Sequence, residues 1–127
     1  GLLSGDVQSP DDIKDGDFRK GVPRFQGDMF EQNKKKAEAL AALAKQKDCT
    51  PAQLSIAWVH HRGEDVFPIP GSKRADRVRE NAKAAHIKLT DDDLKTIENA
   101  VTEFDGDRYP AYAMPMCHEK RKEKQNS

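Results

Sequence analysis

One short stretch, residues 66–81, combines a chain turn with basic and amide side chains. Pro70 and Gly71 interrupt an apolar run, and Ser72 then offers an N-cap for a helix. The first turn of a helix has free backbone N–H groups and the positive end of a dipole, a combination that suits an anion such as phosphate. The stretch therefore predicts an anion-binding site.

The side chains that follow Ser72 are suited to a nucleotide. Lys73, Arg74 and Arg77 carry permanent positive charge, and arginine can hold a phosphate through two hydrogen bonds. Arg77 and Asn81 are four residues apart, so they share one face of the predicted helix, with Glu80 beside them. Carboxylate and amide groups there can hydrogen-bond a planar base. Taken alone, however, this cluster is better explained as an ordinary solvated helix end.

A strand and a helix are predicted to position this stretch. Residues 66–69 form an apolar run with two β-favouring residues, which indicates a buried strand that ends at the proline. On the helix that follows, Ala75, Val78 and Ala82 form the edge expected to face the core.

Three further helices are predicted from their start signals. One begins at Asp28 with an apolar stripe that runs to Ala44. A second has Thr50 at the N-cap, proline at the first helical position and Gln53 at the third. A third starts at Thr90, and the three aspartates behind it fit the helix dipole better than a metal site, so no metal ligand is assigned.

Residues 6–27 carry Gly, Pro and Asp at short intervals and predict a long loop over the body of the protein. Phe18 and Phe25 either anchor this loop or, together with Arg24, clamp a ligand. The anchor is the favoured interpretation, and the clamp stays open.

Three segments, in this order, resemble the aldo-keto reductase family. Residues 1–5, Gly-Leu-Leu-Ser-Gly, are similar to the end of the loop after the seventh strand in that family. Residues 50–58, Thr-Pro-Ala-Gln-Leu-Ser-Ile-Ala-Trp, look like the helix that comes next. Residues 69–74, Ile-Pro-Gly-Ser-Lys-Arg, followed by Glu80 and Asn81, resemble the cofactor signature near the C-terminus. Three matches in order are far more specific than any one of them.

The resemblance implies an α/β fold, namely the C-terminal portion of a (β/α)8 TIM barrel, mostly helical as it stands. The chain has 127 residues, whereas a complete barrel needs about 250. Residues 1–116 would form the C-terminal part of an NADP-dependent oxidoreductase domain. Residues 117–127 are a charged tail that we expect to be disordered.

The same resemblance implies an NADP(H)-dependent oxidoreductase that reduces aldehydes or ketones by hydride transfer, with a small-molecule carbonyl compound as its substrate. In the family a Tyr, a Lys, an Asp and a His carry the catalysis, from early strands of the barrel. The sequence starts after those strands, so no catalytic residue is assigned, and we expect this chain alone to be inactive.

The family pattern also implies roles in binding NADP. Ser72 and Lys73 would contact the 2′-phosphate, and Arg77 would contact that phosphate or stack on the adenine. Glu80 and Asn81 would reach the edge of the adenine. These assignments rest on the resemblance.

Three further positions belong to the implied cofactor site. Gly71 stands where some family members carry Lys, which leaves the strength of the preference for NADP over NAD open. Leu3 and Gly5 would approach the pyrophosphate through backbone groups.

Composition argues against several other functions. The formal net charge is +0, with 22 basic and 22 acidic residues, so no overall field attracts nucleic acid or a membrane. No apolar run of about 18 residues is present. Cys49 and Cys117 are expected to be free thiols in a reducing compartment, which indicates a cytoplasmic location. The sequence leaves the oligomeric state open.

Two alternative functions remain at this stage. A non-catalytic regulatory or interaction protein that binds NADPH would need the same cofactor-binding residues. A small helical module that binds nucleic acid through a basic helix is the third hypothesis, and the neutral net charge argues against it.

Overall fold

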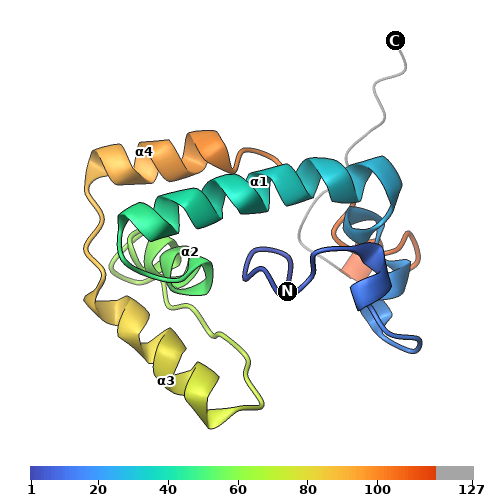
Figure 1. Ribbon diagram of the computed structural model, residues 1–127, viewed down its shortest axis with the longest axis horizontal. Helices are drawn as coiled ribbons and strands as arrows, with labels where there is room; N and C mark the ends of the chain where they lie inside the picture. The colour runs from blue at the N-terminus through green and yellow to red at the C-terminus, as the bar shows by residue number, and fades with distance from the viewer. Residues whose placement is uncertain (117–127) are drawn as a thin grey trace.

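The computed structural model describes residues 1–116, and this part of the chain is helical, with no strand (Figure 1). The expectation of a mostly helical chain is confirmed for these residues. The tail predicted to be disordered, residues 117–127, lies outside them. The α-helices of the described part are α1 (Gly27–Gln46), α2 (Pro51–His60), α3 (Ala75–Lys83) and α4 (Asp91–Ala100). Its short 3-10 helices are η1 (Pro10–Asp12), η2 (Phe18–Gly21), η3 (Pro23–Phe25), η4 (Ala84–His86) and η5 (Met114–Met116).

Helices α1, α2 and α4 pack around the larger of two apolar clusters. In Figure 1, α4 lies alongside α1, α2 lies against the C-terminal half of α1, and α3 extends away from them. Each of the three packed helices contributes apolar side chains at helical spacing, as their amphipathic patterns require. The buried members of this cluster are Leu40, Ala44, Leu54, Ala57, Leu89 and Ile97.

Two of the predicted helix starts are confirmed in detail. Thr50 Oγ1 accepts a hydrogen bond from the backbone N–H of Gln53 at 3.2 Å, and Gln53 Oε1 accepts one from the N–H of Thr50 at 3.0 Å. Thr90 forms the same capping box with Asp93, so at least one of the three aspartates acts at the helix start. Asp28 is not an N-cap, because α1 begins at residue 27 and places Asp28 in the first turn.

The predicted long loop folds into three short 3-10 helices over a second apolar cluster. Its buried members, Leu2, Val7, Ile13 and Phe30, come from the N-terminal turn, the loop and the start of α1. Phe25 packs against this cluster, which confirms its role as an anchor.

Asn33 fastens the end of this loop to the C-terminal segment. Its side chain is fully buried, and Nδ2 donates to the carbonyl oxygens of Arg24 at 3.2 Å and Asp105 at 2.8 Å. Its Oδ1 accepts from the backbone N–H of Asp105 at 2.8 Å. Lys36, one turn further along α1, pairs with the Asp105 carboxylate at 2.7 Å. The buried side chain of Asn33 therefore binds three backbone groups from two distant segments.

The buried strand predicted for residues 66–69 is not formed in the described structure. These residues are without regular secondary structure, and Phe67 and Ile69 are 75% and 94% exposed. A strand exists only through hydrogen bonds to a neighbouring strand, and no extended segment of residues 1–116 pairs with this one. The apolar sequence alone does not supply that partner.

Helix α3 also differs from expectation. Its N-cap is Arg74, so Ser72 does not cap it. The Ser72 hydroxyl instead bonds the backbone of Arg74, accepting from N at 3.3 Å and donating to O at 3.1 Å. None of the residues of α3 is buried. Val78 is 54% exposed, and both Ala75 and Ala82 are exposed. The predicted core-facing edge is therefore wrong.

Sequence alone predicted free cysteines and no membrane-spanning segment. Cys49 is a free, half-buried thiol, and burial raises its pKa; Cys117 lies outside the described residues. No helix in the part of the chain that the structure describes has the length and apolar character needed to cross a bilayer.

We expect Asn33→Ala to lower the free energy of unfolding by about 2 to 4 kcal/mol, because it leaves one backbone N–H and two carbonyls without their buried partner. Urea unfolding of the intact protein, followed by circular dichroism, measures the change. Its exposed neighbour Gln32 provides the control, since Gln32→Ala should change stability by no more than about 0.5 kcal/mol. Equal effects of the two substitutions would contradict this role of Asn33.

Candidate functional site

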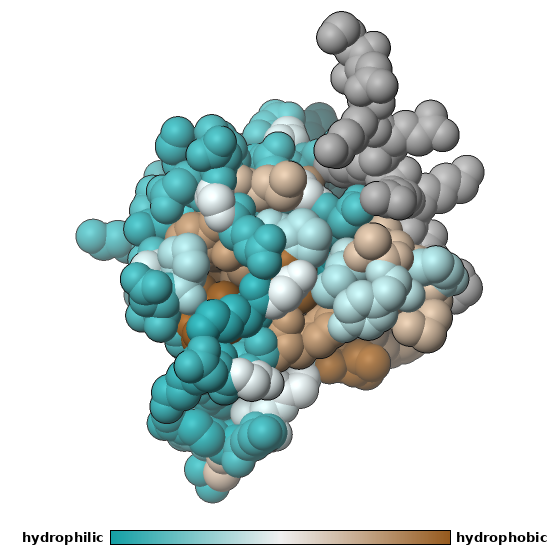
Figure 2. All heavy atoms as spheres, turned by 90° about the vertical axis from the view of Figure 1, so that its right-hand side faces the viewer, coloured by the Kyte–Doolittle hydropathy of each residue, from teal (hydrophilic) through white to brown (hydrophobic). Residues whose placement is uncertain are grey.

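A cavity of about 750 Å³ lies between α3, the N-terminal turn, the loop and the segment after α4. On the face shown in Figure 2, apolar surface is exposed among hydrophilic side chains. The lining combines apolar, aromatic and charged groups from segments far apart in the sequence. The lining includes Leu3, Asp6, Phe18, Arg24, Phe25, Thr50, Gly71, Arg77, Glu80, Asn81 and Tyr109.

The structure brings five of the eight predicted cofactor-binding residues to this cavity. They are Leu3, Gly71, Arg77, Glu80 and Asn81. The other three lie elsewhere: Ser72 and Lys73 are exposed outside the lining, and Gly5 borders a separate cavity of about 60 Å³. Of the two basic residues predicted to bind an anion, Arg77 in the first turn of α3 lines the cavity, whereas Lys73 before the helix does not.

Arg77 is held in the cavity wall by Asp6. The two terminal nitrogens of the guanidinium donate to the two carboxylate oxygens, Nη1 to Oδ2 at 2.8 Å and Nη2 to Oδ1 at 3.1 Å. This is the two-pronged geometry that arginine uses for carboxylates and phosphates alike. The Ser4 hydroxyl also donates to Oδ2 of Asp6, at 3.1 Å.

The pKa of Asp6 reflects this pair. The hydrogen bond from Arg77, with a smaller contribution from Ser4, lowers the pKa from 3.8 to about 2, and the same pair raises the pKa of Arg77. A depressed carboxyl pKa contributes stability that is present above the unfolded value of 3.8 and is lost as the pH falls through about 2. Both side chains are partly exposed, so the contribution is small.

Glu80 binds the start of α2. Its Oε1 accepts a hydrogen bond from the Thr50 hydroxyl at 2.7 Å, and its backbone oxygen accepts one from Gln53 Nε2 at 2.9 Å. The capping box of α2 therefore also fixes the position of α3. The Glu80 carboxylate acts in this position as a structural contact between the two helices.

The side chains of Asn81 and Lys73, unlike those of Arg77 and Glu80, form no hydrogen bond or ion pair within residues 1–116. Asn81 is half-buried in the cavity lining, and its carboxamide makes no hydrogen bond within residues 1–116. Lys73 is exposed and forms no ion pair within the same range. Arg74, by contrast, pairs with Asp76. Asn81 therefore has both donor and acceptor capacity to offer a ligand.

Gly5 and Gly71 differ in whether their backbone conformation requires glycine. Gly5 has a φ of +78° and closes the N-terminal turn with a hydrogen bond from its N–H to the oxygen of Leu2 at 3.1 Å, a conformation that favours glycine. Gly71 does not have a positive φ, and a side chain there would meet no atom within 4 Å. Neither a tight turn nor a close contact therefore requires glycine at position 71.

Aromatic side chains line the part of the cavity formed by the loop. Phe18 is 51% exposed and lies 6.1 Å from the ring of Tyr109. Arg24 donates from Nε to the oxygen of Gly106 at 2.9 Å. Phe18 and Arg24 thus lie in the cavity lining, where the clamp hypothesis requires them.

No sequence motif marks Asp6 or the second role of Thr50. Asp6 and Arg77 are 71 positions apart, and neither carries a local signal that pairs them. The Thr50 capping box was visible, but the bond of its hydroxyl to Glu80 depends on how α2 and α3 pack. Tertiary structure alone reveals both.

We expect the Arg77→Ala substitution to return the pKa of Asp6 from about 2 toward 3.8, because it removes the largest cause of the shift. Titration of the side-chain carboxyl carbon by NMR measures this directly. Arg74→Ala serves as a control, since Arg74 is paired with Asp76 and not with Asp6. An unchanged Asp6 pKa in Arg77→Ala would show that the pair is not formed in solution.

We expect Thr50→Val to lower the free energy of unfolding by about 2 kcal/mol, because it removes both the N-cap of α2 and the hydrogen bond to Glu80. Thr50→Ser keeps the hydroxyl and should retain most of the stability. Hydrogen exchange should show faster exchange in α3 for the valine variant alone. Similar exchange in both variants would contradict the coupling of α2 to α3.

Comparison with known proteins agrees with the motifs. The sequence pattern of the Aldo/keto reductase family matches residues 1–102. Over 112 residues the chain is 41% identical to "Aldo-keto reductase yakc [NADP(+)]" of Schizosaccharomyces pombe, which covers 87% of this chain and 33% of that protein. The chain thus spans about a third of the length of this curated relative. Four-tenths identity over most of the chain, in addition to the family match, shows that the chain belongs to the aldo/keto reductase family.

Proposed function

We propose that the protein is an NADP(H)-dependent oxidoreductase that reduces aldehydes or ketones, and that this chain binds the adenosine and 2′-phosphate end of the cofactor. The observation that carries the proposal is the joint position of Arg77 and Asn81. They lie four residues apart on α3, and both line the cavity. The name of the fission yeast relative includes NADP(+), which supports the choice of cofactor.

The residues at the cavity fit such a group. A volume of about 750 Å³ lies within the range of small-molecule sites, about 300 to 1,000 Å³. Arg77 would hold the 2′-phosphate, Asn81 would hydrogen-bond the adenine, and the Leu3 turn would approach the pyrophosphate. When bound, the cofactor supplies the hydride for a carbonyl carbon. The proposed role of Glu80 is to hold α3 in place, with its second carboxylate oxygen available to the base.

Ser72, Lys73 and Gly5 take a smaller part in this proposal, because none of them lines the cavity. Lys73 is exposed near the same helix end, and its charge adds to the attraction of a phosphate at longer range. The proposal assigns no catalytic role to any residue of this chain.

The proposal includes the fold of the whole protein. Family membership implies a (β/α)8 barrel, in which phosphate sites gather at the loops after the last two strands. The helices described here would form part of its outer ring. Residues 66–69, of which Phe67 and Ile69 are exposed, would become a strand only when another strand pairs with them. The proposal also places the enzyme in the cytoplasm, with a small carbonyl compound as its substrate.

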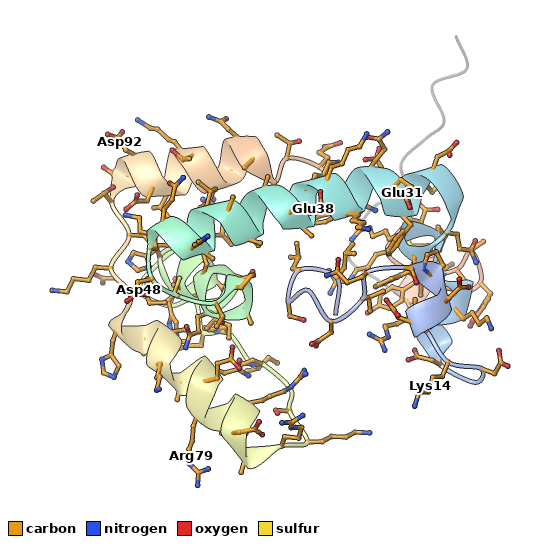
Figure 3. The ribbon with its side chains drawn as sticks, viewed as in Figure 1. Lys14, Glu31, Glu38, Asp48, Arg79 and Asp92 are labelled. Carbon is orange, nitrogen blue, oxygen red and sulfur yellow. The ribbon has the colours of Figure 1, made fainter. Side chains whose placement is uncertain are left out.

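We expect the double variant Arg77→Ala and Asn81→Ala to bind NADPH about 10- to 100-fold more weakly, because it removes a charged phosphate contact and an amide hydrogen bond. Fluorescence titration of the intact protein with NADPH measures the affinity. Arg79→Ala is the matched control: Arg79 lies on the same helix, points away from the body (Figure 3) and is absent from the cavity lining.

Three results would count against the proposal. Equal affinity of the double variant and the wild type would place the cofactor elsewhere. Binding of NADPH without reduction of any aldehyde or ketone by the intact protein would favour the non-catalytic regulator. Tight, salt-dependent binding of DNA or RNA would favour the third hypothesis.

A further inference from the structure

We propose that Asp6 determines cofactor specificity: it competes with the 2′-phosphate for Arg77 and so weakens the preference for NADP(H) over NAD(H). This inference rests on the proposed function, because it concerns the same cavity. It assigns a role to a residue that no motif marks. In this role Asp6 opposes the binding of one cofactor rather than contributing to it.

The geometry of the pair is the first argument. Both terminal nitrogens of Arg77 are engaged by the two oxygens of Asp6, at 2.8 Å and 3.1 Å. A phosphate that binds the same edge of the guanidinium in this two-pronged manner competes for those two nitrogens. It takes that edge only by displacing the carboxylate. A cofactor without the 2′-phosphate makes no such demand and leaves the pair intact.

Charge is the second argument. The Asp6 carboxyl, with its pKa near 2, is ionised at neutral pH, and the Ser4 hydroxyl at 3.1 Å helps to keep it beside Arg77. A 2′-phosphate at Arg77 would meet this negative charge in addition to losing the nitrogens. The competition acts only on a phosphate bound at Arg77, and the repulsion is largest there because a 2′-phosphate at Arg77 would lie beside the Asp6 carboxylate.

The solvent exposure of Arg77 and Asp6 determines how strongly Asp6 changes the preference for NADP(H). The side chains of Arg77 and Asp6 are 46% and 38% exposed, so the carboxylate can move into solvent without disturbing a core. Partly exposed ion pairs are weak because water screens them. Asp6 is thus expected to modulate the preference by a modest factor and not to abolish binding of NADP(H).

The adjacent pair of Arg74 and Asp76 offers a matched comparison. It has the same chemistry, lies on the same helix end and is exposed, with side chains 66% and 61% accessible. Neither residue lines the cavity. Asp76→Asn therefore removes the same charge from the same region without releasing Arg77.

The test compares NADPH and NADH binding to the intact protein by fluorescence titration. We expect Asp6→Asn to raise the affinity for NADPH about three- to tenfold and to change that for NADH by less than about twofold. Asp76→Asn should change the ratio of the two affinities by less than about twofold. Thermal melts establish that each variant is folded.

A second comparison uses the Arg77→Ala background. If Asp6 acts by occupying Arg77, Asp6→Asn should no longer improve NADPH binding once the arginine is absent. An equal gain in both backgrounds, an equal gain from Asp76→Asn, or no gain in wild type would each overturn the inference. The proposed function fails differently, through wild-type protein that does not bind NADPH or an Arg77→Ala variant that binds it as tightly.

Discussion

Helix α3 is held to the body of the protein by polar contacts, and the cavity depends on them. None of its residues is buried, so burial of apolar surface contributes little to its position. The Thr50 hydroxyl and the Gln53 amide bind Glu80, and Asp6 binds Arg77. Because hydrogen bonds have defined directions, these few contacts fix the rotation of α3 and turn Arg77 and Asn81 toward the cavity.

This arrangement joins a structural element to a functional one. The capping box at Thr50 starts α2, whose residues Leu54 and Ala57 belong to the main apolar cluster. The same threonine bonds Glu80 on α3, so the position of α3 follows from the packing of α2. Each bond is worth about 0.5 to 1.5 kcal/mol, so a ligand that binds α3 can shift its position at a small cost in free energy.

Local signals predicted much of the fold. The capping boxes at Thr50 and Thr90 need only residues three apart, and the apolar stripe of α1 needs only its own period, so all were visible in the sequence. The strand at residues 66–69 was not predictable in the same way, since its existence depends on a partner. For α3 the apolar residues gave the wrong core-facing edge, because Val78 is exposed while polar residues make the contacts with the body.

The site was predictable where family motifs covered it and not where it depends on packing. The motif identified Arg77, Glu80 and Asn81, which the structure places at one cavity. It gave no indication that Asp6, 71 positions away, neutralises the arginine. Similarly, nothing in the sequence marked Asn33 as the buried link between the loop and the C-terminal segment.

A site whose arginine is already paired exchanges one anion for another when it binds phosphate. The free energy gained is therefore the difference between two similar contacts and not the full value of a new one, so selectivity between phosphorylated and unphosphorylated ligands becomes sensitive to a single carboxylate. An unpaired arginine would bind phosphate more tightly but would leave an uncompensated charge facing the apolar part of the cavity. Without a bound anion, Asp6 balances the charge of Arg77 and joins α3 to the N-terminal turn. When a phosphate displaces Asp6, the phosphate balances that charge instead.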